Sequence, residues 1–173
     1  DRMAKEVMVP RQDVDCVFVE DGYDEAMKVI RSKVHTRYPL CVEDKDHIIG
    51  LVHIKDLMER PYQARKDLRN VKRDILTVPE VMKLSTLLQY MRTRRIYQAV
   101  VVDEYGGMVG LVGLEDIIEE LVGDIQDEHE PHLPATMSYA DGSFEFDGKV
   151  LVDEVAEIMD IEIDNSDSDT IGG

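Results

Sequence analysis

An internal repeat restricts the fold of this chain more than any other feature of the sequence. The segment YPLCVEDKDHIIGLVHIKDL, residues 38–57, returns sixty residues later as QAVVVDEYGGMVGLVGLEDI, residues 98–117. The tripeptide GLV stands at residues 50–52 in the first copy and at residues 110–112 in the second. A repeat of this length predicts two copies of one supersecondary unit.

Each copy shows the pattern of a hairpin that runs into a helix. Two apolar runs flank an acidic turn, which is typical of paired strands. An amphipathic helix is predicted before each hairpin, and a short β-branched run precedes that helix, at residues 16–19 and 75–78. The helix of the second copy has apolar residues at positions i, i+3, i+4 and i+7, namely Leu84, Leu87, Leu88 and Met91, and the first copy has the shorter set Ala26, Met27, Val29 and Ile30.

Each unit is therefore expected to be β-α-β-β-α, and the fold class to be α+β with the two repeats packed as a pseudo-twofold pair. The helix that closes the second unit carries an apolar stripe from Leu114 to Val122, and Gly123 is expected to end it. Residues 58–70 are polar and predict a surface linker with a turn or two of helix.

The charge distribution predicts a boundary near residue 126. Residues 1–125 contain 23 acidic and 19 basic residues, whereas residues 126–173 contain 14 acidic residues and Lys149 as the one base. We expect repeat 1 with an N-terminal lead-in over 1–64, repeat 2 over 65–126, and a linker with a truncated small α+β domain over 127–173.

Composition excludes several classes of function. A formal charge of −17 argues against a nucleic-acid partner, because binding to a phosphate backbone needs a basic surface. Cys16 and Cys41 stand in strand-like runs and are expected to be reduced and buried, as in a cytosolic protein. No apolar run approaches the roughly 20 residues that span a bilayer, so the chain given is expected to be soluble.

Catalysis and metal binding are not expected. The sequence lacks a Ser-His-Asp or Cys-His arrangement and a pair of acids typical of glycoside hydrolysis, so we expect no enzyme. The stretch DIQDEHEPH, residues 124–132, gathers carboxylates and two histidines, but Pro131 interrupts the helical spacing that a compact metal site needs. A solvated hinge is the favoured interpretation.

Several stretches together resemble a known family. The segments VMVPRQDV, TRYPL, IIGLVHIKDL, VVVDEYGGMVGLVGLEDIIEELVGDIQDEHE and DTIGG resemble a tandem pair of CBS domains, or Bateman module, and more narrowly the CorC/HlyC family of magnesium and cobalt efflux proteins. The resemblance implies a regulatory module that binds AMP or ATP and forms a homodimer. It also implies a membrane domain before the pair, a transporter-associated domain after it, and a location on the cytoplasmic side of the plasma membrane.

The resemblance points to two candidate nucleotide sites. The usual motif is a Ser or Thr at a strand end, followed three residues later by an Asp whose carboxylate binds both ribose hydroxyls. The matching stretches are His53 to Asp56 and Gly113 to Asp116, so both copies keep the Asp and lose the hydroxyl. Gly113 leaves room for a ligand, whereas His53 is large enough to fill its own pocket. We therefore expect one occupied site at Asp116 and a weaker or empty site at Asp56.

The phosphates need a cation from another part of the chain. Glu115 and Asp116 oppose the attraction of the helix dipole for an anion at this helix start. The family pattern implies that Arg37 reaches the phosphates, with Arg95 as a secondary candidate and Mg²⁺ as a counter-ion that bridges ATP phosphates. The adenine is expected against Leu111 and Val112, with packing or backbone contacts from Tyr38, Pro39 and Leu40.

Two alternatives remain open at this point. Asp116 taken alone is most simply a first-turn acid that the helix dipole favours. The whole pair is alternatively a structural dimerisation module whose nucleotide sites are degenerate. The favoured hypothesis is an adenine-nucleotide-binding regulatory module of a magnesium and cobalt transporter.

Overall fold

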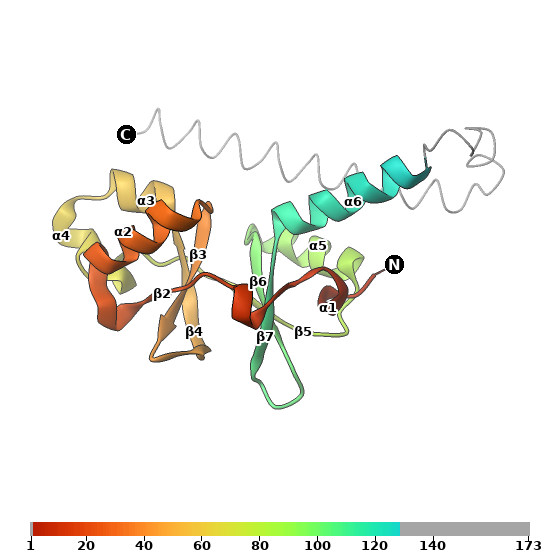
Figure 1. Cartoon of the computed structure of the whole chain (residues 1–173), viewed down its shortest axis with the longest axis horizontal. Helices are drawn as coiled ribbons and strands as arrows, with labels where there is room; N and C mark the ends of the chain where they lie inside the picture. Colours follow the sequence, from red (N-terminus) through yellow and green to blue (C-terminus); the bar gives the residue numbers. More distant parts are fainter. Residues whose placement is uncertain (1, 129–173) are drawn as a thin grey trace.

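Two β-sheets with their own helices make up residues 2–128, the part of the chain that the computed structural model describes (Figure 1). The first sheet has the order β2 (Val17–Phe18), β3 (Arg37–Val42), β4 (Asp44–His53), and the second has the order β1 (Val9–Pro10), β7 (Met108–Gly113), β6 (Gln98–Val102), β5 (Leu76–Pro79). In both sheets the first strand of the repeat is parallel to the second, and the second is antiparallel to the third. This shared order confirms the predicted β-α-β-β-α unit.

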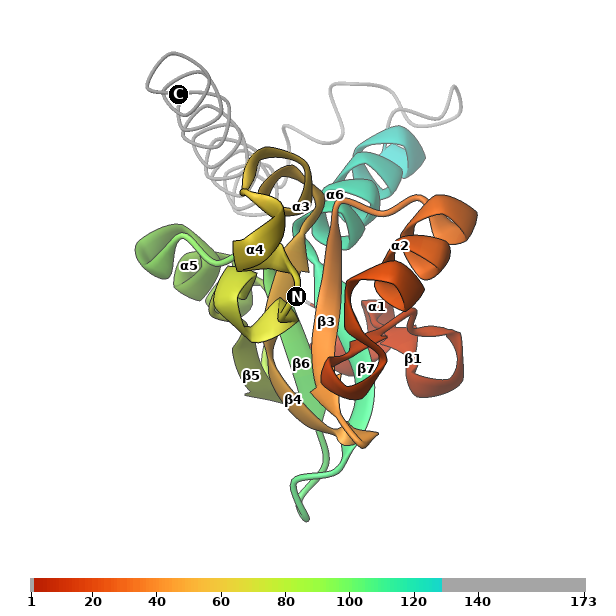
Figure 2. The ribbon, with the colours of Figure 1, turned by 90° about the vertical axis from the view of Figure 1, so that its left-hand side faces the viewer.

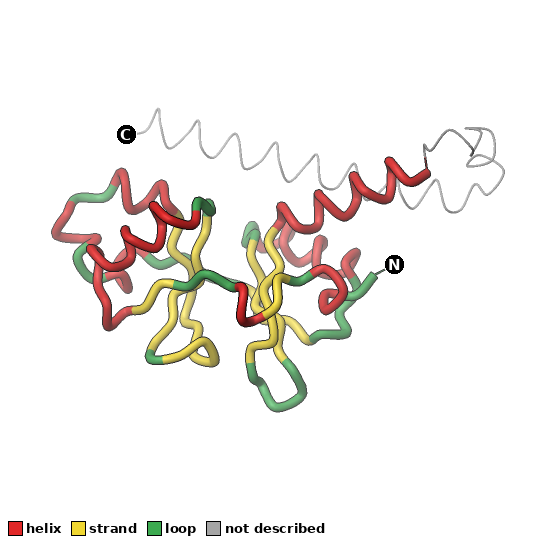
Figure 3. The backbone as a smooth tube through the Cα atoms, viewed as in Figure 1, coloured by secondary structure: helices red, strands yellow, loops and turns green. Residues whose placement is uncertain are grey.

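The helices cover the sheets and connect their parallel strands (Figure 3). The α-helices are α1 (Ala4–Val7), α2 (Gly22–Lys33), α3 (Ile54–Glu59), α4 (Tyr62–Arg65), α5 (Leu84–Arg94) and α6 (Leu114–Glu128), and the 3₁₀ turns are η1 (Arg11–Asp13), η2 (Val19–Asp21) and η3 (Leu68–Val71). The four apolar residues predicted for the stripe of α5 are all buried, because parallel strands need a crossover that packs on their sheet. Among the described residues, no helix is both long enough and apolar enough to span a bilayer.

The predicted end of α6 is wrong. The helix continues through Gly123 to Glu128, and Gly123 does not adopt a positive φ. A glycine inside a helix costs about 1 kcal/mol, which lowers the stability of the helix without ending it, and Arg2 contacts Asp124 one residue further along at 3.4 Å. The predicted third domain lies, from residue 129 onward, outside the described residues.

The two repeats exchange their lead-in segments. Strand β1 pairs antiparallel with β7 of the second repeat, with Val9 opposite Leu111, and Ala4 of α1 belongs to the core of that repeat. In return, Arg73 of the segment before β5 pairs with Leu51 of the first repeat, through N···O distances of 2.8 and 2.9 Å. The sequence assigns the lead-in to the first repeat, but the structure packs it on the second sheet (Figure 1).

This exchange explains the glycine of each GLV tripeptide. A Cβ on Gly50 would lie 2.6 Å from the carbonyl oxygen of Arg73, and a Cβ on Gly110 would lie 2.6 Å from the carbonyl oxygen of Val9. Both crossing backbones therefore need a glycine opposite them. Gly50 and Gly110 therefore have the same role in the two repeats.

The two sheets pack side by side through a shared apolar core (Figures 1 and 2). Its buried members come from the lead-in and from both sheets: Val14, Cys16, Cys41, Val100 and Met108. Both cysteines are buried free thiols, as expected. Burial of apolar surface between the sheets holds the repeats in one arrangement.

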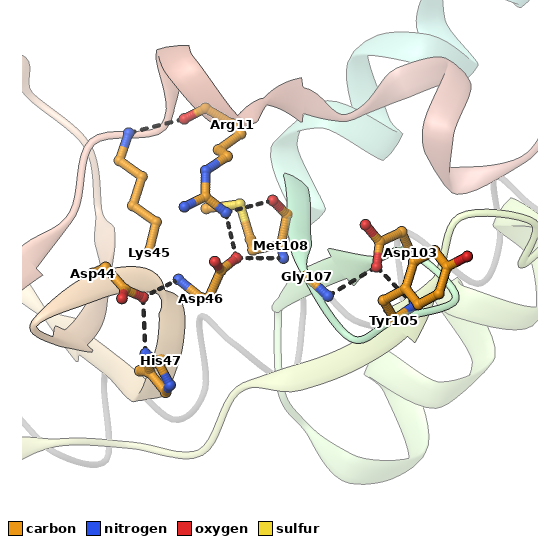
Figure 4. Close-up of polar contacts among 9 residues, drawn as sticks. All are labelled: Arg11, Asp44, Lys45, Asp46, His47, Asp103, Tyr105, Gly107 and Met108. Atoms are coloured by element: carbon orange, nitrogen blue, oxygen red, sulfur yellow. Dashed lines mark hydrogen bonds and ion pairs between the residues drawn. The ribbon is translucent and has the colours of Figure 1, made fainter.

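Polar contacts join the hairpins of the two repeats at one end of this core (Figure 4). Asp46, in the β3–β4 hairpin, forms an ion pair with Arg11 and accepts a 3.0 Å hydrogen bond from the backbone N–H of Met108. Arg11 also donates to the carbonyl oxygen of Met108 at 2.9 Å. Lys45 donates to the carbonyl oxygens of Arg11 and Val14 at 2.9 and 2.8 Å. The lead-in is thus bonded to both hairpins.

Gly110→Ala is expected to destabilise the protein, because the new Cβ meets the backbone of Val9. An overpacked position of this kind costs about 1–3 kcal/mol in the free energy of unfolding, which urea denaturation measures. Gly123→Ala is the matched control: its Cβ meets nothing within 4 Å, and it should stabilise α6 by about 0.5–1 kcal/mol. Equal free energies for Gly110→Ala and the unsubstituted protein would contradict the close approach.

Candidate functional site: a cleft between the repeats

A cleft of about 280 Å³ opens where β3 begins and where β7 runs into α6. One wall comes from the lead-in and the first repeat, and includes Asp15, His35 and Arg37. The other wall comes from the second repeat, and includes Gln98 and Asp116. A ligand in this cleft would therefore contact both repeats.

The start of α6 places the Asp116 carboxylate in the cleft. The N–H of Leu114 donates to the carbonyl oxygen of Tyr97 at 2.9 Å, and the N–H of Gly113 donates to Asp116 Oδ2 at 2.7 Å. The latter contact is half of a capping box, in which an acid at the third helical position reaches back to the cap residue. Burial raises the pKa of Asp116, an effect that the Gly113 N–H partly offsets.

Arg37 supplies a buried cation from the opposite repeat. Its side chain is 6% exposed, and Nη1 lies 2.8 Å from Oε1 of Glu115, whose side chain is 65% exposed. Burial lowers the pKa of Arg37, and the Glu115 carboxylate opposes that shift. Because Glu115 is largely in solvent, an anionic ligand could replace it as the partner of the guanidinium without burying a second carboxylate.

The remaining charges of the cleft are mostly negative. Asp15 pairs with His35 at 2.8 Å on the rim, and the acidic lining residues are Asp13, Asp15, Glu115 and Asp116. The basic lining residues are Arg37 and His35. Such a cleft suits a ligand with hydroxyl donors and few uncompensated negative charges, or a phosphate chain accompanied by a cation. Within residues 2–128, no group of three or more His, Cys, Asp or Glu side chains could itself hold a metal ion.

Gly113 provides the space in which these carboxylates sit. A Cβ at this position would lie 2.9 Å from Glu115 Oε2 and 3.6 Å from Asp116 Oδ2. The nearer atom is the end of a flexible, exposed side chain that can move. The glycine in place of the usual hydroxyl therefore makes room beside Asp116.

The matching position in the first repeat has a different environment. Asp56 receives a bidentate pair from Arg73, with distances of 2.6 Å to Oδ2 and 2.9 Å to Oδ1. Arg73 is the residue that crosses at Leu51, as Val9 crosses at Leu111. Arg73 thus engages both oxygens of Asp56. In the second repeat the matching crossing residue is the apolar Val9, which lines the same cleft as Asp116.

His53 caps α3 and replaces the usual hydroxyl in that role. Its Nδ1 accepts a 3.1 Å hydrogen bond from the N–H of Lys55, so the ring must be unprotonated there. Burial, with the nearby guanidinium groups of Arg73 and Arg37, lowers the pKa of His53 to about 4. The sequence predicts a histidine that fills its own pocket; the structure adds that it caps the helix.

The other predicted site residues are distributed as follows. The cleft brings together Arg37, Leu111, Gly113, Glu115 and Asp116. Tyr38, Leu40 and Val112 are fully buried in the two repeat cores, Pro39 pairs with Leu51 inside the first sheet, and Arg95 ends α5 as an exposed residue with φ 56°. None of these last five is among the residues that line the described cleft.

Sequence reasoning missed five polar lining residues, Asp13, Asp15, His35, Thr36 and Gln98. The first two belong to the lead-in, and only the exchange between repeats brings them to the second repeat. Gln98 of the second copy matches Tyr38 of the first copy in the repeat alignment. A polar residue at a position that is apolar in the other copy was the signal that could have identified Gln98.

Comparison with known proteins identifies the family to which the chain belongs. The CBS-domain family model matches residues 4–62 and 66–123. The UPF0053 protein YugS of Bacillus subtilis is 39% identical over 174 residues, which are 99% of this chain and 41% of that protein. The magnesium and cobalt efflux protein CorC of Escherichia coli is 36% identical over 132 residues, 75% of this chain and 45% of that protein. The chain thus spans about two fifths of these relatives.

Two similar solved structures contain adenine nucleotides. The CBS domain of a bacterial CNNM/CorC family Mg²⁺ transporter in complex with ATP is 34% identical, with a TM-score of 0.65 over 70% of this chain and 87% of that one. A CBS-domain pair with bound AMP from Klebsiella pneumoniae is 29% identical, with a TM-score of 0.60 over 70% of this chain and 99% of that one.

The cap made by His53 predicts a specific loss of stability in acid. In the folded protein the His53 ring stays neutral down to about pH 4, its lowered pKa. In the unfolded chain the same ring takes up a proton near pH 6.5. The unfolded state therefore binds more protons between these values, and the His53 contribution to stability falls as pH drops through this window.

His53→Ser keeps a cap and removes the titration. The free energy of unfolding of this variant, measured by denaturant titration at about pH 7 and pH 4.5, should fall less than that of the unsubstituted protein. His35 and His47 are present in both proteins, so the difference isolates His53. The same fall in both proteins would mean that His53 is not held neutral.

Proposed function

The chain belongs to the CBS-domain family, as a tandem pair related to the CorC and hemolysin C proteins, and we propose that it is the adenine-nucleotide-binding regulatory module of a magnesium and cobalt transporter. The observation that carries this proposal is that one cleft is lined both by the Asp116 carboxylate and by Arg37, a buried arginine from the other repeat. The carboxylate offers acceptors to a ribose diol. The planar guanidinium of Arg37 offers paired donors to a phosphate.

The charge of the cleft bears on the form of the nucleotide. Four carboxylates face two basic residues, so each added phosphate increases repulsion unless a cation accompanies it. AMP is therefore the simplest ligand, and ATP should bind better with Mg²⁺ than without it. A dependence of ATP binding on Mg²⁺ would link nucleotide binding to magnesium, one of the two ions in the name of the related efflux protein.

Regulation follows from the position of the ligand between the repeats. A nucleotide that contacts both walls favours one angle between the two sheets, and it can change a coupled transport domain only as far as it binds the two arrangements with different affinity. The relative YugS is more than twice as long as this chain. We propose that the module acts as a homodimer on the cytoplasmic side of the plasma membrane, attached to a membrane transport domain.

A second candidate function is a structural dimerisation module that binds no nucleotide. The pairing of Asp56 with Arg73 favours it for the first site, since a carboxylate held by two short hydrogen bonds is a poor ribose acceptor. The second site favours the nucleotide-binding module for two reasons. Its cleft is open, and a phosphate could take the place of the exposed Glu115 carboxylate as the partner of Arg37.

Isothermal titration calorimetry with AMP, ADP and ATP, with and without Mg²⁺, separates these functions. The regulatory module predicts binding heat for AMP and a Mg²⁺-dependent gain for ATP. Absence of heat and of a thermal shift with every nucleotide at millimolar concentration would leave the structural module. Nucleotide hydrolysis in the same samples would instead indicate an enzyme.

Asp116→Asn should weaken AMP binding about tenfold or more, because hydrogen bonds to a charged acceptor are the stronger kind. Asp56→Asn is the matched control at the other motif, and it should change AMP affinity by less than about twofold, since Arg73 occupies that carboxylate. Calorimetric titration of both variants decides the question. Equal losses of affinity would refute the preference for the Asp116 site.

A further inference from the structure

A buried amide in the wall of the cleft has an unused acceptor. Gln98 begins β6, is 5% exposed and lines the cleft. Its Nε2 donates to the carbonyl oxygen of Arg37 at 3.4 Å. Its Oε1 is buried and has no hydrogen-bond partner among the described residues. A buried acceptor without a donor costs free energy, so such groups in proteins call for an explanation.

Gln98 and Asp116 belong to the same wall of the cleft. Gln98 lies directly opposite Gly113 in the β6–β7 pair, and the side chains of directly opposed residues lie on the same face. On that face, the Cβ that Gly113 lacks would lie 3.6 Å from Asp116 Oδ2. Gly113 therefore puts no side chain of its own between the amide and the carboxylate.

The amide orientation limits what could bind there. Because Nε2 donates to the Arg37 carbonyl, the orientation of the amide is set, and the atom left without a partner within residues 2–128 is the acceptor Oε1. Asp116 is also an acceptor. Two neighbouring acceptors need a ligand with two neighbouring donors, and phosphate oxygens only accept at neutral pH. The cis-diol of a ribose is the donor pair that an adenine nucleotide offers.

We propose that Gln98 is a specificity-determining residue that shares the ribose hydroxyls with Asp116 and selects ribonucleotides over 2′-deoxyribonucleotides. The proposal rests on the proposed function, since it requires a nucleotide in the cleft. A site whose buried acceptors are built for a hydroxyl rejects the analogue that lacks it, because the acceptors are then left unpaired.

The test compares AMP with 2′-deoxy-AMP on the unsubstituted protein and on Gln98→Met, which keeps the length of the side chain and removes the acceptor. The unsubstituted protein should bind AMP at least about tenfold more tightly than 2′-deoxy-AMP. In Gln98→Met the AMP affinity should fall about five- to tenfold while the 2′-deoxy-AMP affinity changes by less than about twofold, so the preference shrinks. Gln89→Met is the matched control on exposed α5 surface, and it should leave both affinities unchanged.

The outcomes distinguish the two proposals. Binding of AMP with an undiminished ribose preference in Gln98→Met overturns the role of Gln98 and leaves the proposed function standing. Binding of neither nucleotide by the unsubstituted protein overturns both.

A second variant protects the test against a folding defect. Gln98→Met could unfold at a much lower temperature than the unsubstituted protein. In that case Gln98→Asn serves instead: it draws the acceptor back by one methylene and should give an intermediate loss of ribose preference. On the unsubstituted protein, equal affinities for AMP, 2′-deoxy-AMP and 3′-deoxy-AMP would overturn the proposal without any variant.

Discussion

The exchange of lead-in segments between the repeats is the constraint on which the rest of this structure depends. Val9 lies along β7 and Arg73 lies along β4, and each crossing is close enough to require a glycine, Gly110 or Gly50, opposite it. The exchange bonds each repeat to the other and carries the segment with Asp13 and Asp15 to the second repeat. Without it the cleft would lose one wall.

The same exchange makes the two repeats chemically unequal. The crossing positions at Leu51 and Leu111 are equivalent in the pseudo-symmetric pair, yet one carries an arginine and the other a valine. The guanidinium of Arg73 binds both oxygens of Asp56, whereas Asp116 uses Oδ2 to cap its own helix. A single difference in the lead-in therefore accounts for one open and one occupied carboxylate in a duplicated motif.

The sequence was sufficient for the fold of one unit and insufficient for the contacts between units. The hydrophobic periods and the duplicated GLV and Asp positions predicted the β-α-β-β-α order, because these signals are local. The crossing of the lead-in, the Arg73–Asp56 pair and the position of Gln98 depend on contacts between residues that are far apart in the chain. The sequence does not settle where α6 ends, because a glycine lowers helix stability by about 1 kcal/mol without ending a helix by itself.

The central claim is that one of the two motif carboxylates, Asp116, receives a nucleotide between the repeats. The number of AMP molecules bound per chain at saturation, measured by calorimetry or equilibrium dialysis, tests it most directly. The account predicts one AMP per chain. Two per chain would show that Arg73 does not close the Asp56 site, and none would show that the cleft is not a nucleotide site.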